Sequence, residues 1–154
     1  MRLLELFAGT GSVGKVAKSL GWDVTSLDLD FRTKPDIVAD SLHWNYTNYA
    51  PGLFDVIWAS PPCTEYSVAK TTGTRDLDKA DQIVKHTLEI INHLNPRYFI
   101  IENPQTGMLK DRPFTQSLPF RDIDYCKYGM PYRKRTRLWN NVYCCYATTT
   151  AKPQ

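Results

Sequence analysis

The sequence has 154 residues, 42% of them apolar, and a formal net charge of +3 at pH 7. This length suits one domain with one core, and the apolar fraction excludes a disordered chain. No stretch approaches 18 uninterrupted apolar residues and no secretory pattern opens the chain, so we expect neither a membrane span nor export.

Apolar runs alternate with helical patterns from the start of the chain, which is typical of an α/β sheet. A strand over Arg2–Phe7 is expected to lead through a glycine turn into a helix that Ser12 caps and Gly21 ends. Further strands are expected over residues 23–29, near residues 37–39 and over residues 54–59.

The clearest helix is predicted over residues 76–94, where apolar side chains line one face and Asn95-Pro96 follows as a stop. A strand over residues 98–101 comes next, and residues 105–119 have a loop-like composition. Two last strands, over residues 122–128 and 137–146, are expected to pair around a Gly129-Met130-Pro131 turn, before a frayed tail over residues 147–154. The elements predict a single α/β domain over residues 1–146, with a mostly parallel sheet and a C-terminal antiparallel hairpin.

The turn after the first strand spells GxGxxG, from Gly9 to Gly14. Alone this is a weak signal, because many ordinary strand-to-helix turns carry glycine. An acidic residue about 20 positions later, at the end of the second strand, strengthens the interpretation as a cofactor site. Asp28 is the better candidate to bind a ribose hydroxyl, whereas Asp30 can be a solvated loop carboxylate.

Two more carboxylates are candidates for the same site. Glu5 lies inside an apolar strand, where a carboxylate is costly unless it is satisfied, so we favour a functional or hydrogen-bonded role. Asp40 follows the short third strand, where it either accepts a hydrogen bond from an adenine amino group or caps the next turn.

Cys63 follows a predicted buried strand and the rigid pair Pro61-Pro62, which ends that strand and fixes the direction of the chain. An inert buried thiol is the general alternative, but a thiol held at a strand exit can be a nucleophile if Arg135 or Arg137 lowers its pKa. Glu102 ends the next predicted strand, where it is either a solvated carboxylate or a proton donor to a heterocycle bound opposite Cys63.

Six cations fall between positions 121 and 137, and aromatic residues interleave with them. A solvated surface loop is the simpler explanation. The mixture also fits a nucleic-acid surface, because cations pair with phosphates and rings stack on bases. The cations are Arg121, Lys127, Arg133, Lys134, Arg135 and Arg137.

The four cysteines are Cys63, Cys126, Cys144 and Cys145. Two are adjacent and none forms a CxxC pair, which argues against a disulfide framework or a standard zinc site. We therefore expect no metal, and a reducing intracellular compartment such as the cytoplasm or nucleus.

Four motifs in order resemble those of the C5-cytosine methyltransferases, which methylate cytosine in DNA and, in one branch, tRNA. The cofactor motif is matched by Leu6-Phe7-Ala8-Gly9-Thr10-Gly11, and the nucleophile motif by Pro62-Cys63 with Ser67 downstream. The Glu-Asn pair is matched by Glu102-Asn103 and the basic motif by Lys134-Arg135-Thr136-Arg137. Each motif is weak to moderate alone, but four in order over nearly the whole chain are specific.

The resemblance implies a Rossmann-like class I fold that moves a methyl group from S-adenosylmethionine to cytosine C5 in DNA, with S-adenosylhomocysteine as product. It implies that Cys63 attacks C6 and Glu102 supports protonation at N3, while Arg135 and Arg137 orient the base and a nearby phosphate. The loop over residues 64–75 would close over the site. Residues implied to bind the cofactor are Glu5, Phe7, Ala8, Gly9, Thr10, Gly11, Asp28, Leu29, Asp40, Ser41 and Pro61. Those implied to contact nucleic acid are Ser67, Arg133 and Lys134.

The chain departs from the family pattern after the basic motif, where the DNA enzymes carry a target-recognition region. Only about 15 residues follow Trp139 here, so four alternatives stay open: a minimal enzyme, one subunit of a split enzyme whose partner supplies target recognition, a shortened chain, or a catalytically weak remnant. Other readings stay open: a tRNA cytosine methyltransferase, an amino-methyltransferase of adenine N6 or cytosine N4 suggested by Ser60-Pro61-Pro62, or a non-catalytic module that binds cofactor and nucleic acid.

Overall fold

Seven strands form one sheet in the described part of the chain, residues 1–142 of a computed structural model, in the order β3-β2-β1-β4-β5-β7-β6. The first five strands are parallel, and β7 runs antiparallel to both of its neighbours. The strands are β1 (Arg2–Leu6), β2 (Asp23–Asp28), β3 (Ile37–Val38), β4 (Val56–Ala59), β5 (Tyr98–Pro104), β6 (Phe120–Asp124) and β7 (Arg135–Asn140). The predicted mostly parallel sheet with a C-terminal antiparallel pair is confirmed.

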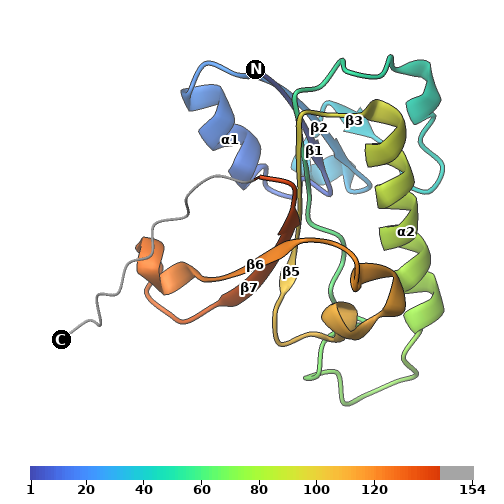
Figure 1. Cartoon of the computed structure of the whole chain (residues 1–154), viewed down its shortest axis with the longest axis vertical. Helices are drawn as coiled ribbons and strands as arrows, with labels where there is room; N and C mark the ends of the chain where they lie inside the picture. The colour runs from blue at the N-terminus through green and yellow to red at the C-terminus, as the bar shows by residue number, and fades with distance from the viewer. Residues whose placement is uncertain (143–154) are drawn as a thin grey trace.

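Two α-helices, α1 (Ser12–Ser19) and α2 (Leu77–Leu94), lie on opposite faces of the sheet (Figure 1). Asp76 caps α2, because its side chain accepts a hydrogen bond from the backbone N–H of Lys79 at 3.0 Å. The predicted Ser12 cap of α1 is wrong: the cap is Gly11, at φ 73°, and its left-handed conformation turns the chain from β1 into the helix. No helix within residues 1–142 is long and apolar enough to cross a membrane.

The C-terminal hairpin differs from its predicted bounds. β6 ends at Asp124, and the chain then forms a short 3₁₀ helix over Tyr125–Tyr128 that Gly129 ends in the left-handed region, at φ 94°. β7 begins two residues earlier than predicted and ends at Asn140, while positions 143–146 and the predicted tail lie outside the described residues. The predicted loop over residues 105–119 holds two further 3₁₀ turns.

Alternation along the strands divides the core into two layers. Leu4, Leu6, Ile57 and Ile101 belong to the larger cluster, which packs with α2, whereas Leu3 and Val56 pack with Ala17 of α1. Because successive side chains of a strand point to opposite faces, Glu5 points to the α1 face. The register pairs Glu5 with Trp58 and Trp58 with Ile100, so Glu102, two residues further along β5, lies on the same face.

Candidate active site

The glycine turn lies at the carboxyl edge of the parallel sheet, where β1 ends. Phe7, Gly9 and Gly11 all have positive φ values of 57°, 52° and 73°. Such values are strained for phenylalanine, and strained backbone of this kind concentrates at binding sites. A Cβ added to Gly9 or Gly11 would meet no atom within 4 Å, so the turn presents bare backbone to an open space. This is the geometry that close approach of a cofactor requires.

Asp28, at the end of β2, braces this turn. One carboxylate oxygen accepts a hydrogen bond from the backbone N–H of Gly9 at 2.8 Å, and the other accepts one from the backbone N–H of Asp30 at 2.8 Å. Each oxygen keeps a further lone pair, so the predicted bond to a ribose hydroxyl remains compatible with this brace. Leu29, also predicted to contact the cofactor, follows with 69% of its surface exposed. Asp30 forms an ion pair with Arg32 at 2.8 Å.

Glu5 is buried and hydrogen-bonded. Its Oε2 accepts a bond from the backbone N–H of Gly14 at 2.9 Å, near the start of α1. A Cβ at Gly14 would lie 2.5 Å from that oxygen, so any larger residue at this position would displace the Glu5 carboxylate. The sequence contained this signal in the third glycine of GxGxxG, whose usual role is close packing of helix on strand. Burial raises the pKa of Glu5 above its ordinary value, although bonds from Gly14 and Val13 oppose that shift.

We expect Glu5→Gln to remove a pH dependence of stability. Because the folded-state pKa of Glu5 is raised, its contribution is present below the unfolded pKa and lost as pH rises through the folded-state value. The free energy of unfolding of the variant, relative to the parent, should therefore increase as pH rises from about 4 to about 7. Urea unfolding of both proteins at several pH values measures this difference in free energy. A difference that stays constant with pH would contradict a raised pKa of Glu5 in the folded state.

Cys63 is exposed and is held at the exit of β4. The backbone N–H of Tyr66 donates to the Cys63 carbonyl at 3.1 Å and closes a turn directly after the cysteine. Two residues before Cys63, the Pro61 carbonyl accepts a hydrogen bond from the Asn103 side chain at 3.0 Å. The buried Asn103 therefore ties the strand exit that carries Cys63 to the strand end that carries Glu102.

A cavity of about 770 Å³ opens on the α1 face of the sheet. The glycine turn and Glu102 both line it, together with Trp58 and Ser60 of the β4 exit and the segment after β6; Cys63 is not among its lining residues. Tyr125, also in the lining, has its pKa raised to about 12 because it is buried and near the Glu102 carboxylate. The cavity joins the predicted cofactor turn to the predicted proton donor.

Sequence reasoning did not assign several of these lining side chains to the site. Trp58 and Ser60 follow from strand alternation, since they lie on the same face as Glu5. Tyr125 and Tyr128 were counted only as part of the basic and aromatic stretch, because that segment was predicted to be a strand rather than a turn over the cavity.

The basic stretch divides between two places. Arg133, Lys134 and Arg135 line a recess of about 430 Å³ with Pro104 to Thr106, at the same carboxyl edge as Glu102. Arg137 lies two residues further along β7 than Arg135 and pairs in register with Asn103, so alternation places both arginines on the sheet face opposite to that of Glu102. Arg135, the first residue of β7, lines the recess at the carboxyl edge, whereas Arg137 lies within the strand.

Arg137 contacts residues of the neighbouring strand β6. It donates two hydrogen bonds to Asp122, at 2.7 and 3.0 Å, and its guanidinium lies 3.7 Å from the centroid of the Phe120 ring. Its predicted role in orienting a base stays a prediction, and the pair with Asp122 uses two of its five N–H donors. Ser67 is half-buried in the loop after Cys63, and its hydroxyl accepts a bond from the Ala69 N–H at 3.2 Å.

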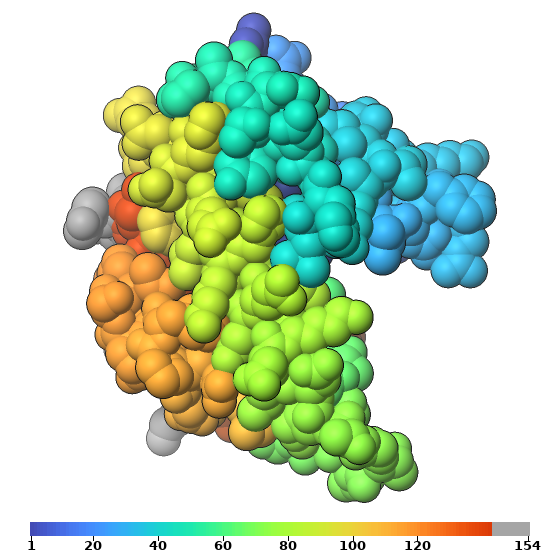
Figure 2. Space-filling view, turned by 90° about the vertical axis from the view of Figure 1, so that its right-hand side faces the viewer, coloured from blue at the N-terminus to red at the C-terminus, as the bar shows by residue number. Residues whose placement is uncertain are grey.

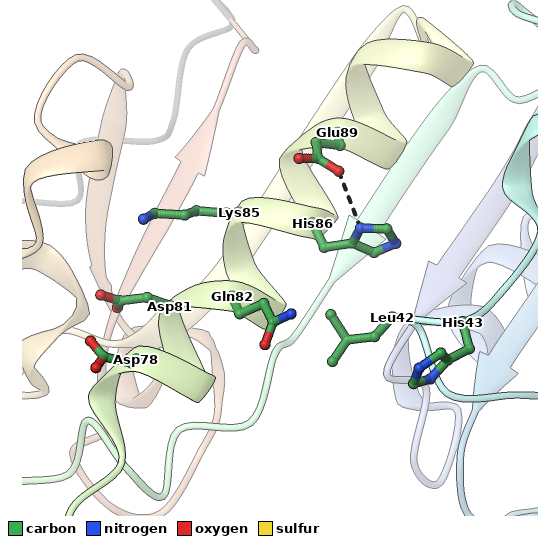
Figure 3. Close-up of a pocket in the computed structure, with 8 residues that line it drawn as sticks. All are labelled: Leu42, His43, Asp78, Asp81, Gln82, Lys85, His86 and Glu89. Atoms are coloured by element: carbon green, nitrogen blue, oxygen red, sulfur yellow. Dashed lines mark hydrogen bonds and ion pairs between the residues drawn. The ribbon is translucent and has the colours of Figure 1, made fainter.

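A second cavity, of about 650 Å³, lies between α2 and the turn that follows β3. Figure 2 shows it as a hollow between that turn and the first half of the helix. Gln82 and His86 point from α2 toward Leu42 and His43 (Figure 3). Asp40 and the buried Ser41 directly precede this lining, and Asp40 accepts a hydrogen bond from the Leu42 N–H at 3.0 Å. Asp40 thus caps its turn, as one of the two alternatives predicted, at the rim of the second cavity.

A comparison with known families shows the family of this chain. Residues 1–115 match the family described as C-5 cytosine-specific DNA methylase. The chain belongs to this family. The chain is also 40% identical, over 157 aligned positions, to the probable DNA (cytosine-5)-methyltransferase of Frog virus 3 (isolate Goorha), covering 92% of this chain and 71% of that protein. The predicted family and enzyme class are confirmed.

Solved structures support the fold of the chain. The S. pombe Dnmt2 methyltransferase superposes with a TM-score of 0.65 at 18% identity, covering 90% of this chain and 50% of that chain. The Entamoeba histolytica methyltransferase EhMeth gives a TM-score of 0.63 at 15% identity, covering 90% and 52%. The chain thus spans about half the length of these solved chains, and at this level of identity the likeness concerns the fold alone.

Proposed function

We propose that this chain transfers a methyl group from S-adenosylmethionine to C5 of cytosine in DNA through a covalent bond between Cys63 and the base. One observation carries the proposal. The Asn103 bond to Pro61 fixes the Cys63 turn beside the end of β5, where Glu102 shares a cavity with the glycine turn. This arrangement supports Cys63 as nucleophile, Glu102 as proton donor and the glycine turn as cofactor site at one edge of the sheet, where ligands bind in open α/β folds.

The residues at this edge fit the cofactor. The open glycine turn admits backbone contact, and cavities of about 770 and 650 Å³ lie in the size range of small-molecule sites. Phe7 to Thr10 would hold the amino-acid portion, and Asp28, Asp40 and Ser41 the adenosine end, in the direction of the second cavity. When bound, S-adenosylmethionine supplies an electrophilic methyl group on a sulfonium.

The chemistry then rests on two side chains. The Cys63 thiolate forms a bond to C6 of an extruded cytosine, while Glu102 gives a proton to N3, so electron density gathers at C5. After C5 has taken the methyl group, loss of the C5 proton to a base restores the double bond and releases the Cys63 sulfur. Arg133, Lys134 and Arg135 would bind phosphates beside the site, because their recess adjoins the end of β5. Free Cys63 and Cys126 suit a reducing compartment.

Transfer of a radiolabelled methyl group to separate DNA and tRNA pools, followed by nucleoside analysis, tests the proposal. We expect label in 5-methylcytosine from DNA. Label in N4-methylcytosine or N6-methyladenine would contradict the C5 chemistry, and label only in tRNA would contradict the DNA substrate. Cofactor binding without transfer would favour a non-catalytic module, and transfer that needs an added protein would identify a split enzyme.

A further inference from the structure

Tyr66 is a fully buried tyrosine only three residues after Cys63. Its backbone makes two bonds: its N–H donates to the Cys63 carbonyl at 3.1 Å, and its carbonyl accepts from the N–H of Met108 at 2.8 Å. A Cβ at Gly107 would lie 3.3 Å from the same Tyr66 carbonyl, so the segment after β5 packs tightly on it. The Cys63 turn is thus fastened to the segment that follows Glu102.

The phenol of Tyr66 is held at its other end by an ion pair. Its hydroxyl donates to Asp81 of α2 at 2.8 Å, and Asp81 accepts bonds from both Nε and Nη2 of Arg112, at 2.9 and 2.6 Å. Asp81 is only 6% exposed, so water is largely excluded from these hydrogen bonds. They are strong because the acceptor is a charged carboxylate. Burial, and then the bond to Asp81, raise the pKa of Tyr66, so the phenol keeps the proton that it donates.

We propose that Tyr66, Asp81 and Arg112 form a positioning cluster that fixes the Cys63 turn relative to α2 and to the end of β5. Tyr66 is a positioning residue, since it acts through the backbone of Cys63. The expected effect on catalysis rests on the proposed function. The expected effect on the position of the Cys63 turn rests on the contacts alone.

The cluster joins three segments that are distant in the sequence. Tyr66 belongs to the loop after β4, Asp81 to α2 and Arg112 to the turns after β5. A buried phenol that packed only as an apolar ring would need no such partner, and a phenylalanine would fill the same volume. Within residues 1–142, the Tyr66 hydroxyl connects the loop after β4 to the Asp81–Arg112 pair, so it adds a fixed point on α2 to the backbone bonds that hold the turn.

Tyr66→Phe tests this with two measurements. Hydrogen–deuterium exchange of residues 63–70 should become about tenfold faster, because loss of one buried hydrogen bond lets the turn open locally. Formation of the covalent adduct with DNA that contains 5-fluorocytosine should slow about tenfold, while affinity for S-adenosylmethionine changes less than about twofold. Tyr49→Phe is the matched control and should change neither rate: Tyr49 is half-buried, and its backbone carbonyl lies 3.1 Å from Nε2 of His93 in the last turn of α2.

Unchanged exchange at residues 63–70, or an unchanged adduct rate in a folded Tyr66→Phe protein, overturns the proposal and leaves Tyr66 a packing residue. Should the parent protein form no adduct, the proposed function fails, and exchange alone then decides the positioning claim. If Tyr66→Phe does not fold, Arg112→Lys replaces it, because lysine keeps the positive charge but cannot donate the two hydrogen bonds that Nε and Nη2 of Arg112 make to Asp81. Asp81 is not varied, since it also lines the second cavity.

Discussion

Replacing Cys63 by alanine should abolish methyl transfer to cytosine, a loss of at least about a thousandfold in kcat. The reason is that no other group at the exit of β4 offers a nucleophile that adds to C6, and the unactivated pyrimidine does not attack a sulfonium. Affinity for S-adenosylmethionine should change little, because Cys63 is exposed and the glycine turn is built from β1 and its bond to Asp28.

The adduct with 5-fluorocytosine DNA provides the direct measurement. Fluorine at C5 cannot leave as a proton does, so the sulfur stays bonded to C6 and the complex survives denaturation. We expect this band from the parent and from Cys126→Ala, which removes the other exposed free cysteine of the described residues, but not from Cys63→Ala. Adduct formation by Cys63→Ala would place the nucleophile elsewhere and end the mechanism.

Glu102→Gln should lower turnover by about a hundredfold or more, because glutamine accepts and donates hydrogen bonds but does not release a proton to N3. The substitution keeps the size of the side chain, so β5 and its register with β7 should persist. Single-turnover methyl transfer measures the loss, and equilibrium binding of S-adenosylmethionine gives the comparison.

Binding is the deciding comparison because Glu102 and the glycine turn line the same cavity. An equal loss of cofactor affinity would mean that Glu102 holds the cofactor and does not serve the base. Asp23→Asn is the matched control: it removes the same charge at the opposite edge of the sheet, where β2 begins, and should leave both quantities unchanged.

Strand and helix patterns were readable from the sequence because they depend on local spacing. The apolar face of α2, the buried runs of β1 and β4 and the stop at Asn95 are periodic or adjacent signals. The same holds for the order of the four motifs, which indicated the family before any contact was known. The hairpin was less predictable, because the turn over Tyr125–Tyr128 depends on how that segment packs over the cavity.

The sequence by itself thus determined the fold class, the family and the chemical types of the site residues. The tertiary structure decided which of them meet: Asp28 braces Gly9, Glu5 meets Gly14, and Asn103 holds Pro61. It also turned Arg137 toward Asp122 and placed Tyr66 against α2. The physical reason is that a side chain's direction follows from strand register and from partners far along the chain. A one-residue shift in that register moves a side chain to the other face of the sheet. The spacing of residues within one strand does not determine the register.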